Sequence, residues 1–260
     1  MFDYVTDLDS NRRKNKKINL KDKFYDKSAL TDTIDNDCES GISKSCTTLF
    51  ENIIGYNNIK KIFSFVISSQ LPVHILLVGP PGSAKTLFLM ECMNFQRSYF
   101  TLGSHSTKAG MVDYLFASRP RNLIIDEIEY MPIKDQAVLL SLMETGILSE
   151  TKFGKTRKAV MKTWVFASCN DEKKLLTPLL SRFLILYFKK YDYDSFLTIT
   201  EHLLLKECNL ESIISKQIAY LVWNKLKSKD IRDCIKIGRL SKNVEDVDLI
   251  IETLKQYKKK

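Results

Sequence analysis

The sequence contains no apolar run long enough to cross a membrane. A bilayer span needs about 20 consecutive apolar residues, whereas the longest apolar stretch, residues 73–78, has only the length of a buried strand. Residues 1–7 include neither a basic segment nor an apolar core, so no secretory signal is visible there. We therefore expect a cytoplasmic protein with no membrane partner.

Cysteine and histidine are too few and too scattered to indicate a metal centre. The six cysteines form no CxxC pair and there are only three histidines, so we expect reduced structural thiols and no zinc site. The remaining composition, 44% hydrophobic and 27% charged, excludes a wholly disordered chain, a collagen-like chain and a disulfide miniprotein. The 260 residues suffice for one large domain or two modest ones.

The excess of positive charge lies in the part of the sequence that is expected to fold. The chain has 40 Lys and Arg against 31 Asp and Glu, a formal charge of +9. Residues 1–48 hold nine basic and nine acidic side chains, which cancel, so the whole excess belongs to residues 49–260. A basic surplus on a folded domain favours a polyanionic partner such as nucleic acid, although a solvated lysine-rich surface explains it equally well.

The apolar pattern changes at residue 49. Residues 1–48 are polar and poor in periodic apolar positions, which predicts a mobile leader. Over residues 49–190, apolar strands alternate with amphipathic helices, which predicts an α/β fold with a three-layer α/β/α parallel sheet. Helical spacing over residues 191–260 predicts a smaller all-α domain. Strands are expected at 73–78, 98–102, 122–125, 163–167 and 184–188, and helices at 57–69, 85–94, 111–116 and 134–144.

A loop with two glycines, residues 79–86, lies between the first expected strand and the helix that follows. In this context backbone N–H groups and a helix amino end can converge on phosphates, Lys85 can reach the β- and γ-phosphates, and the Thr86 hydroxyl can bind Mg²⁺. The usual glycine before the lysine is Ala84 here, and its methyl group is tolerable if the backbone is already in helical φ and ψ. The expected nucleotide-binding residues are Gly79, Pro80, Pro81, Gly82, Ser83, Ala84, Lys85 and Thr86.

Two carboxylates end the expected strand at residues 122–125. Asp126 can hold Mg²⁺ through water, and Glu127 can orient and deprotonate a water for attack on a γ-phosphate. An acidic pair after an apolar run is a weak signal alone. It gains weight because Asp126 follows Lys85 by 41 residues, two strands further along the pattern.

These motifs resemble the AAA+ ATPase family over roughly residues 49–245. The resemblance implies a P-loop NTPase fold with a helical lid, with ATP and Mg²⁺ as cofactors. It also implies that Ile54 and Gly55, in the linker before the first helix, pack on adenine. Asn170 matches the sensor-1 residue that positions the attacking water, so the resemblance makes Lys85, Glu127 and Asn170 catalytic.

Two arginines complete the resemblance. Arg232 fits the sensor-2 arginine of the lid, which contacts bound nucleotide, and Arg182 lies in a segment that looks like the arginine finger. In this family the finger acts on the γ-phosphate held by the neighbouring subunit, and such fingers are worth roughly 10³–10⁵ in rate. The resemblance therefore implies that Arg182 is catalytic in a homo-oligomeric ring, with a hexamer expected.

A basic segment, residues 146–162, is expected to form a β-hairpin. It looks like the pre-sensor-1 hairpin of AAA+ proteins that thread DNA or polypeptide, and lysines and arginines there would track a phosphate backbone. Phe153 keeps a polypeptide-threading role open, and a solvated turn is the structural alternative. The DNA-binding candidates are Lys152, Lys155, Arg157 and Lys158.

Within the family the pattern is most similar to RuvB-type Holliday-junction branch-migration ATPases, in a shortened archaeal form. Ala84 instead resembles MoxR- and MCM-like ATPases. Only 28 residues follow Arg232, fewer than a winged-helix domain needs, so DNA recognition would rest on the hairpin, the lysine-rich tail or a separate partner protein. We expect an ATPase that remodels or translocates DNA. A MoxR-like chaperone acting on protein complexes and a nucleotide-gated switch with negligible turnover are the alternatives.

Overall fold

A computed structural model describes residues 50–51, 53–104, 108–152 and 155–257, without the side chains of Lys108, Lys152 and Lys155. The described residues belong to one compact unit, residues 44–260. Residues 1–48, expected to form a leader, lie outside the described residues. Among the described helices, none is both long and apolar enough to traverse a bilayer.

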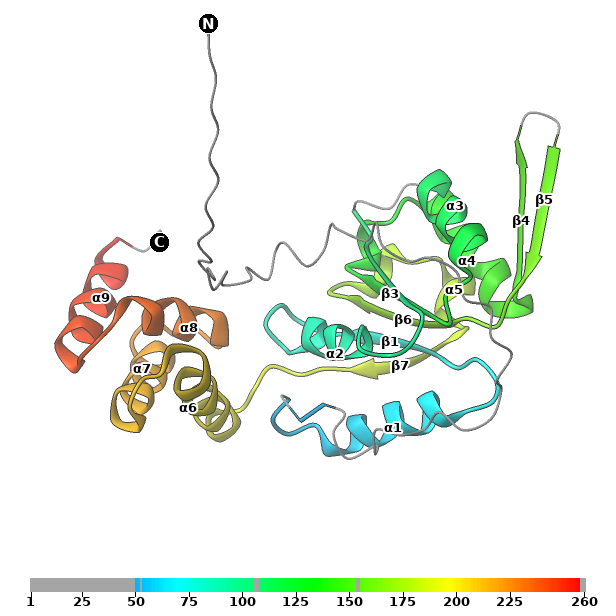
Figure 1. Cartoon of the computed structure of the whole chain (residues 1–260). Helices are drawn as coiled ribbons and strands as arrows, with labels where there is room; N and C mark the ends of the chain where they lie inside the picture. The colour runs from blue at the N-terminus through cyan, green and yellow to red at the C-terminus, as the bar shows by residue number, and fades with distance from the viewer. Residues whose placement is uncertain (1–49, 52, 105–107, 153–154, 258–260) are drawn as a thin grey trace, which may run out of the picture. The chain divides into compact units, whose positions relative to one another are not determined.

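Five parallel strands form one sheet, in the spatial order β2-β3-β6-β1-β7 (Figure 1). β1 pairs with β6 and β7, and β3 pairs with β2 and β6, all in parallel. The carboxyl ends of the strands therefore meet at one edge, where ligands of open α/β sheets bind. The strands are β1 (His74–Val78), β2 (Ser98–Leu102), β3 (Asn122–Asp126), β6 (Trp164–Cys169) and β7 (Phe183–Tyr187).

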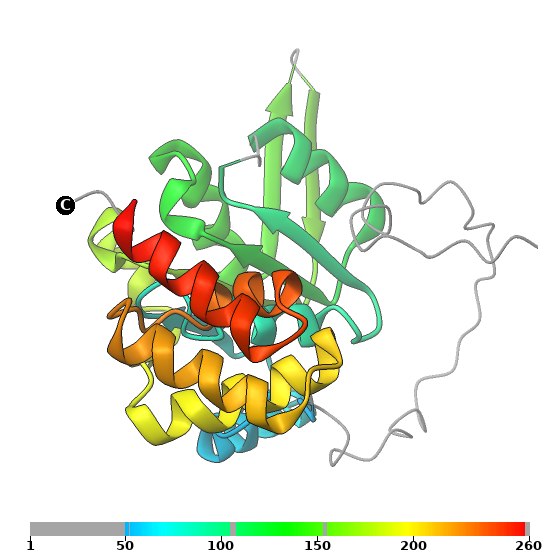
Figure 2. The same cartoon turned by 90° about the vertical axis from the view of Figure 1, so that its left-hand side faces the viewer.

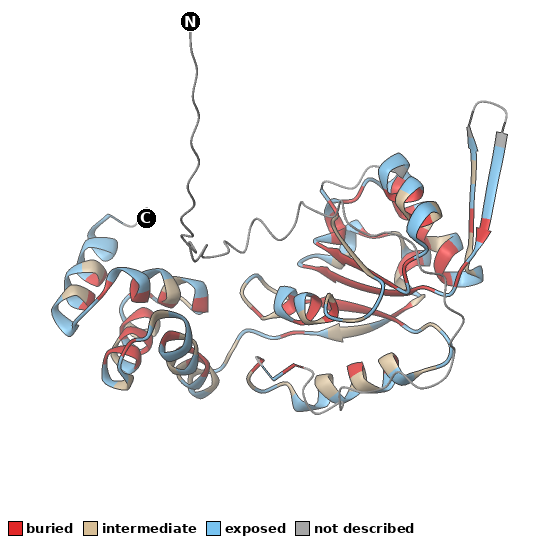
Figure 3. Ribbon diagram, in the orientation of Figure 1, coloured by how far each residue is buried: buried red, intermediate tan, exposed pale blue. Residues whose placement is uncertain are grey.

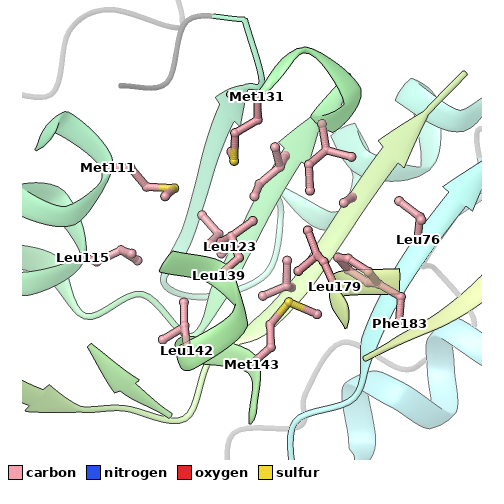
Figure 4. Close-up of a cluster of buried hydrophobic side chains, with 14 of the residues drawn as sticks. Leu76, Met111, Leu115, Leu123, Met131, Leu139, Leu142, Met143, Leu179 and Phe183 are labelled. Carbon is pink, nitrogen blue, oxygen red and sulfur yellow. The ribbon is translucent and has the colours of Figure 1, made fainter. Parts of the chain in front are cut away.

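Helices cover both faces of the sheet. The helices are α1 (Asn57–Ser68), α2 (Lys85–Cys92), α3 (Lys108–Ser118), α4 (Ile133–Thr145) and α5 (Thr177–Leu180). On one face, Leu76 of β1 and Leu123 of β3 belong to a cluster with residues of α3, α4 and α5, shown in Figure 4. On the other face, Ile75 and Ile124 cluster with residues of α1 and α2. Adjacent strand residues thus face opposite helical layers, as the two-residue period of a strand requires.

The three central strands are apolar along most of their length because both of their faces are covered. Every residue of β1, β3 and β6 is buried, and these strands are the red ribbons at the centre of Figure 3. A strand buried on both sides needs a continuous apolar run instead of an alternating one. The expected α/β parallel sheet is confirmed. The expected strand and helix bounds differ from the observed ones by up to three residues.

A two-stranded antiparallel hairpin interrupts the α/β alternation after α4. It consists of β4 (Ile147–Lys152) and β5 (Lys155–Val160), paired from Ile147 opposite Val160 to Lys152 opposite Lys155. Its base is anchored in the core, since Leu148 and Ala159 are buried with residues of α3 and α4. The sequence therefore located the hairpin correctly.

Four helices follow the sheet, coloured from yellow to red in Figure 2, and no strand occurs over residues 191–257. They are α6 (Tyr193–Cys208), α7 (Ser212–Asn224), α8 (Ile231–Leu240) and α9 (Val244–Gln256). Their apolar faces form a separate buried cluster that includes Phe196, Ile218 and Val247. Asp192, Asp230 and Asn243 cap the amino ends of α6, α8 and α9 through their side chains. The division of the chain into domains at residue 190 stays a prediction.

A buried histidine links three elements of the core. His74 is 5% exposed. Its Nδ1 accepts a hydrogen bond from the backbone N–H of Val165 at 3.1 Å, and its Nε2 lies 3.2 Å from the carbonyl oxygen of Met143. One ring nitrogen must therefore accept and the other donate, which is the pattern of a neutral imidazole. Burial lowers the pKa of His74 below its usual value of 6.5.

We predict that His74 makes the fold sensitive to acid. Because the folded-state pKa is depressed, the unfolded chain binds the proton first, and stability falls as pH drops below about 7 toward the folded-state pKa. The slope contributed by one group is at most about 1.4 kcal/mol per pH unit. Urea unfolding at several pH values between 7.5 and 5 measures it. His74→Gln, which has one acceptor and one donor group but does not titrate, should flatten the curve. Parallel pH curves for the two proteins would contradict this assignment.

Candidate nucleotide site

The phosphate loop follows β1 and runs into the amino end of α2. Gly82 has φ +77° and Ala84 has φ +68°, so the chain enters the left-handed region twice before the helix begins. Such a backbone turns N–H groups toward one point and forms a concavity that suits an anion. That the loop binds phosphate stays a prediction.

The backbone of Ala84 differs from the expectation. The alanine was interpreted as tolerable because its backbone would already be helical, but its φ of +68° and ψ of 4° lie in the left-handed region. A non-glycine residue there costs roughly 1–2 kcal/mol. The methyl group is thus strained, and the loop keeps its conformation because the surrounding structure imposes it.

Lys85 is the buried cation of the loop. Its Nζ donates to the carbonyl oxygens of Gly79 and Pro80, at 2.7 and 2.8 Å, and to Oδ1 of Asn170 at 3.1 Å. Burial lowers the pKa of Lys85, and the nearby charge of Asp126 opposes that shift. The structure therefore brings together the lysine that was expected to bind phosphate and the asparagine that was expected to position water.

Asp126 ends β3 and joins three neighbours. Its Oδ2 accepts a hydrogen bond from Thr86 Oγ1 at 2.9 Å. Its Oδ1 accepts from the Ser168 hydroxyl and from the backbone N–H of Glu127, the latter at 3.1 Å. Asp126 is 6% exposed, whereas Thr86 is exposed. Asp126 and Thr86 were the expected Mg²⁺ residues, and the structure places them in direct contact.

This oxygen pair fits Mg²⁺. The ion prefers hard oxygen ligands and is commonly held by one or two side chains together with substrate phosphates and water, without a protein cage. Consistent with that, no group of three or more His, Cys, Asp or Glu gathers as a metal cluster among the described residues. Thr86 and Asp126 would hold the ion, which would neutralise charge on the phosphates.

Glu127 lies at the carboxyl end of β3 in a strained backbone conformation. Its φ is +54°, in the left-handed region, and the residue is exposed. Gly103 makes room for the turn, because a Cβ at Gly103 would come within 2.2 Å of the Glu127 carbonyl oxygen. Strain of this kind persists mainly at functional sites. The turn leaves the Glu127 side chain in solvent beside the buried Asp126.

A cavity of about 320 Å³ adjoins the loop. Ile54 and Gly55 line it, and so do Tyr56 and Tyr191, whose rings pack edge to face with centroids 6.1 Å apart. Tyr56 also donates a hydrogen bond to the Ser83 carbonyl oxygen at 3.3 Å. The cavity and the phosphate loop are thus connected through one side chain. That Ile54 and Gly55 pack on adenine stays a prediction.

The described hydrogen bonds of Arg232 go to Asp230 and not to the phosphate loop. Its guanidinium donates to both carboxylate oxygens of Asp230, with Nη2 to Oδ2 at 2.7 Å. Asp230 in turn lies against the loop, because a Cβ at Gly82 would come within 2.7 Å of its Oδ1. The sensor-2 role of Arg232 stays a prediction.

Arg182 follows α5 and pairs within its own chain. Its guanidinium contacts the Glu144 carboxylate and the Pro178 carbonyl oxygen. None of its described hydrogen-bond partners belongs to the phosphate loop. Arg182 is therefore placed apart from the Lys85 group, and its role as an arginine finger stays a prediction.

The hairpin candidates are not equivalent. Arg157 pairs with Asp113 of α3 and with Glu150 of β4, and its guanidinium lies 4.7 Å from the centroid of the Phe116 ring. Two carboxylates thus neutralise it, and its contacts fasten β5 to its neighbours. Lys158 is exposed. Lys152 and Lys155 have side chains outside the described atoms.

Sequence reasoning missed two residues of the site. Ser168 bonds to Asp126, and Glu129 accepts hydrogen bonds from the backbone N–H and Nδ2 of Asn170 at 2.8 and 3.0 Å. A weak signal existed for each. Ser168 is a polar residue inside an apolar strand, and Glu129 is an acid between the apolar residues Ile128 and Met131.

Comparison of the fold with solved structures decides its class. The Thermotoga maritima RuvB Holliday junction branch migration motor matches with a TM-score of 0.57 and 21% identity, over 77% of this chain and 70% of that one. A point mutant of the same RuvB matches with a TM-score of 0.58 and 20% identity over the same shares. The chain has the AAA+ ATPase fold. The expected AAA+ resemblance and the RuvB-like architecture are confirmed.

The sequence itself is distantly similar to MCM proteins. Arabidopsis thaliana DNA replication licensing factor MCM7 is 27% identical in an alignment of 214 residues, gaps included, that covers 65% of this chain and 30% of that protein. Xenopus tropicalis maternal DNA replication licensing factor mcm6 is 26% identical in an alignment of 154 residues, gaps included, that covers 48% of this chain and 19% of that protein. This chain thus spans less than a third of the length of these curated relatives. No protein-family model matches it.

We predict that Ala84→Gly stabilises the chain. The substitution removes a left-handed strain of roughly 1–2 kcal/mol and adds about 0.5–1 kcal/mol of chain entropy to the unfolded state. The free energy of unfolding should rise by up to about 1 kcal/mol, which urea denaturation measures.

The matched control is the opposite change in the same loop. Gly82→Ala places a Cβ at φ +77° and against Asp230, so it should destabilise the chain by more than Ala84→Gly stabilises it. A loss of stability in Ala84→Gly would show that the methyl group is not strained.

Proposed function

We propose that the chain binds Mg·ATP and hydrolyses it. The observation that carries the proposal is the convergence of two hydrogen-bonded pairs, Thr86 with Asp126 and Lys85 with Asn170, beside a loop whose backbone suits an anion. The first pair suits a metal ion that bridges phosphates. The second holds a cation where phosphate charge would accumulate. Exposed Glu127 follows Asp126 directly and would be the base that orients and deprotonates water.

We propose that the active form is a ring of copies, a hexamer. Arg182 supports this inference because it forms an ion pair with Glu144 of the same chain and not a contact with the phosphate loop. An arginine finger supplied by a neighbouring copy would stabilise the negative charge that develops on the γ-phosphate during hydrolysis. The pair with Glu144 is solvent-accessible, so it is weak and can exchange for a phosphate.

The proposed substrate of the motor is DNA. Support comes from the basic excess of residues 49–260 and from distant similarity to proteins named as replication licensing factors and to a branch migration motor. The hairpin and the residues that follow it would contribute Lys158 and Lys162, both exposed. Phosphate contacts by lysines give affinity with little base preference.

Remodelling of a protein complex is the second candidate function, and one observation favours it. Arg157, the arginine of the hairpin, is paired with Asp113 and Glu150. The Arg157 side chain is 44% exposed, so these pairs are weak, but a phosphate backbone would still have to displace two carboxylates from it. Asp113 and Glu150 thus reduce the positive charge around Arg157.

Steady-state ATP hydrolysis with and without duplex or junction DNA tests the proposal. We predict turnover that DNA stimulates, with the stimulation falling steeply between about 50 and 200 mM salt because counterions are released on binding. Glu127→Gln should keep ATP binding and lose turnover.

Lys158→Ala combined with Lys162→Ala should reduce the stimulation by DNA without changing basal turnover. Lys242→Ala is the matched control, since it removes an exposed lysine from the loop before α9. Turnover indifferent to DNA would favour protein remodelling. Phosphate release no faster than in buffer would contradict ATP hydrolysis itself.

A further inference from the structure

Glu129 is a buried carboxylate that the proposed catalytic step does not use. It lies in the 3₁₀ turn η2 (Ile128–Tyr130), two residues after Glu127, and is 5% exposed. Its Oε1 accepts hydrogen bonds from the backbone N–H of Asn170 at 2.8 Å and from Asn170 Nδ2 at 3.0 Å. A buried carboxylate is costly unless hydrogen bonds compensate it. Here both bonds come from one residue.

The second oxygen of this carboxylate has no such compensation. Glu129 Oε2 is buried and has no hydrogen-bond partner among the described residues. A group that served packing alone would be favoured as a neutral side chain, because an incompletely paired buried charge is destabilising. A buried polar atom without a protein partner calls for an explanation, such as a water, an ion or a role in catalysis. A carboxylate differs from neutral alternatives in that both oxygens can only accept.

That property determines how the Asn170 amide is oriented. A carboxylate accepts and an ammonium group donates, so Nδ2 of Asn170 must face Glu129 and Oδ1 must face Lys85. The observed contacts agree, with Oδ1 3.1 Å from Lys85 Nζ. Asn170 is exposed while Lys85 and Glu129 are buried. The amide therefore links the buried charges to the open side of the phosphate loop.

We propose that Glu129 is a positioning residue that fixes Oδ1 of Asn170 as the atom presented to the reacting water. The inference rests on the proposed ATP hydrolysis and deepens it. The water oxygen forms a bond to the γ-phosphorus while the bond to the β–γ bridging oxygen breaks, and ADP leaves with that electron pair. One water proton passes to Glu127, and the other is held by Oδ1 of Asn170.

Reversal of the amide would remove this arrangement. Nδ2 would then face Lys85 as donor against donor, and the water would meet N–H groups where it needs an acceptor. Alignment of a nucleophile within a site controls rate strongly, and misplacement by about 1 Å can cost roughly 10²-fold. Glu129 therefore acts on the rate of hydrolysis through Asn170 and not on the binding of ATP.

Four variants test the proposal: Glu129→Ala, Glu129→Gln, Asn170→Ala and the double variant of Glu129→Ala with Asn170→Ala. The kcat of ATP hydrolysis, the Kd for ATP and the Tm are measured for each. Glu129→Ala should lower kcat by about 10- to 100-fold with Kd unchanged. Glu129→Gln keeps one acceptor toward Asn170 but adds an amide donor that allows the Asn170 amide to reverse, so it should recover only part of the loss. The double variant should turn over no more slowly than Asn170→Ala, because one residue acts through the other.

Several outcomes would overturn the proposal. They are an unchanged kcat in Glu129→Ala, a double variant slower than Asn170→Ala, and a Glu129→Gln variant as slow as Glu129→Ala. Should Glu129→Ala fail to fold, Glu129→Met fills the same volume without an acceptor and takes its place. The wild-type rate is measured first. If the wild type does not hydrolyse ATP, the proposed function is contradicted as well. If the wild type hydrolyses ATP and Glu129→Ala is equally fast, only the proposed role of Glu129 is contradicted.

Discussion

The hydrogen bonding of one buried carboxylate, that of Asp126, holds the candidate site together. This carboxylate is buried at the carboxyl end of β3. It accepts hydrogen bonds from Thr86 at the amino end of α2, from Ser168 of β6 and from the backbone N–H of Glu127. A buried charge without such donors would be strongly unfavourable. The parallel register of β3 with β6 supplies one donor and the packing of α2 on the sheet supplies another. Strand order, helix position and site chemistry are therefore linked by one group.

Two of the eight non-glycine residues with positive φ among the described residues lie beside that group. Ala84 and Glu127 both have positive φ in the left-handed region, at +68° and +54°, and they lie within two residues of Thr86 and Asp126 respectively. Each such residue costs of order 1–3 kcal/mol and persists only where the surroundings determine it. The sheet edge and the α2 amino end supply those surroundings. The same rigidity keeps the oxygen atoms for a metal ion and the base for water in fixed relation.

Much of this arrangement was predictable from the sequence, for a physical reason. A parallel strand buried on both faces has a continuous apolar sequence. Polar residues at the carboxyl ends of such strands lie together at one edge of the sheet. Asp126 was found in that way, and Asn170 was found from its place after such a strand together with the family resemblance. The bounds of the elements followed from the same pattern, to within three residues.

What could not be predicted depends on side-chain partners that are distant in the sequence. Arg157 was expected to face DNA, but it meets Asp113, 44 residues away, and no local pattern reports that contact. Glu129 and Asn170 are 41 residues apart and meet only because η2 lies beside the end of β6. The left-handed backbone of Ala84 was missed because alanine usually signals the right-handed helix that it enters.

The most direct test is the Mg²⁺ dependence of ATP affinity, measured by calorimetric titration with and without the ion. Because Thr86 and Asp126 provide oxygen ligands in direct contact, the wild type should bind ATP more tightly with Mg²⁺, and Asp126→Asn should lose most of that gain while it keeps binding without the ion. Two results would contradict the central role of this carboxylate: a wild type whose ATP affinity does not change with Mg²⁺, or an Asp126→Asn variant whose ATP affinity rises with Mg²⁺ as much as that of the wild type.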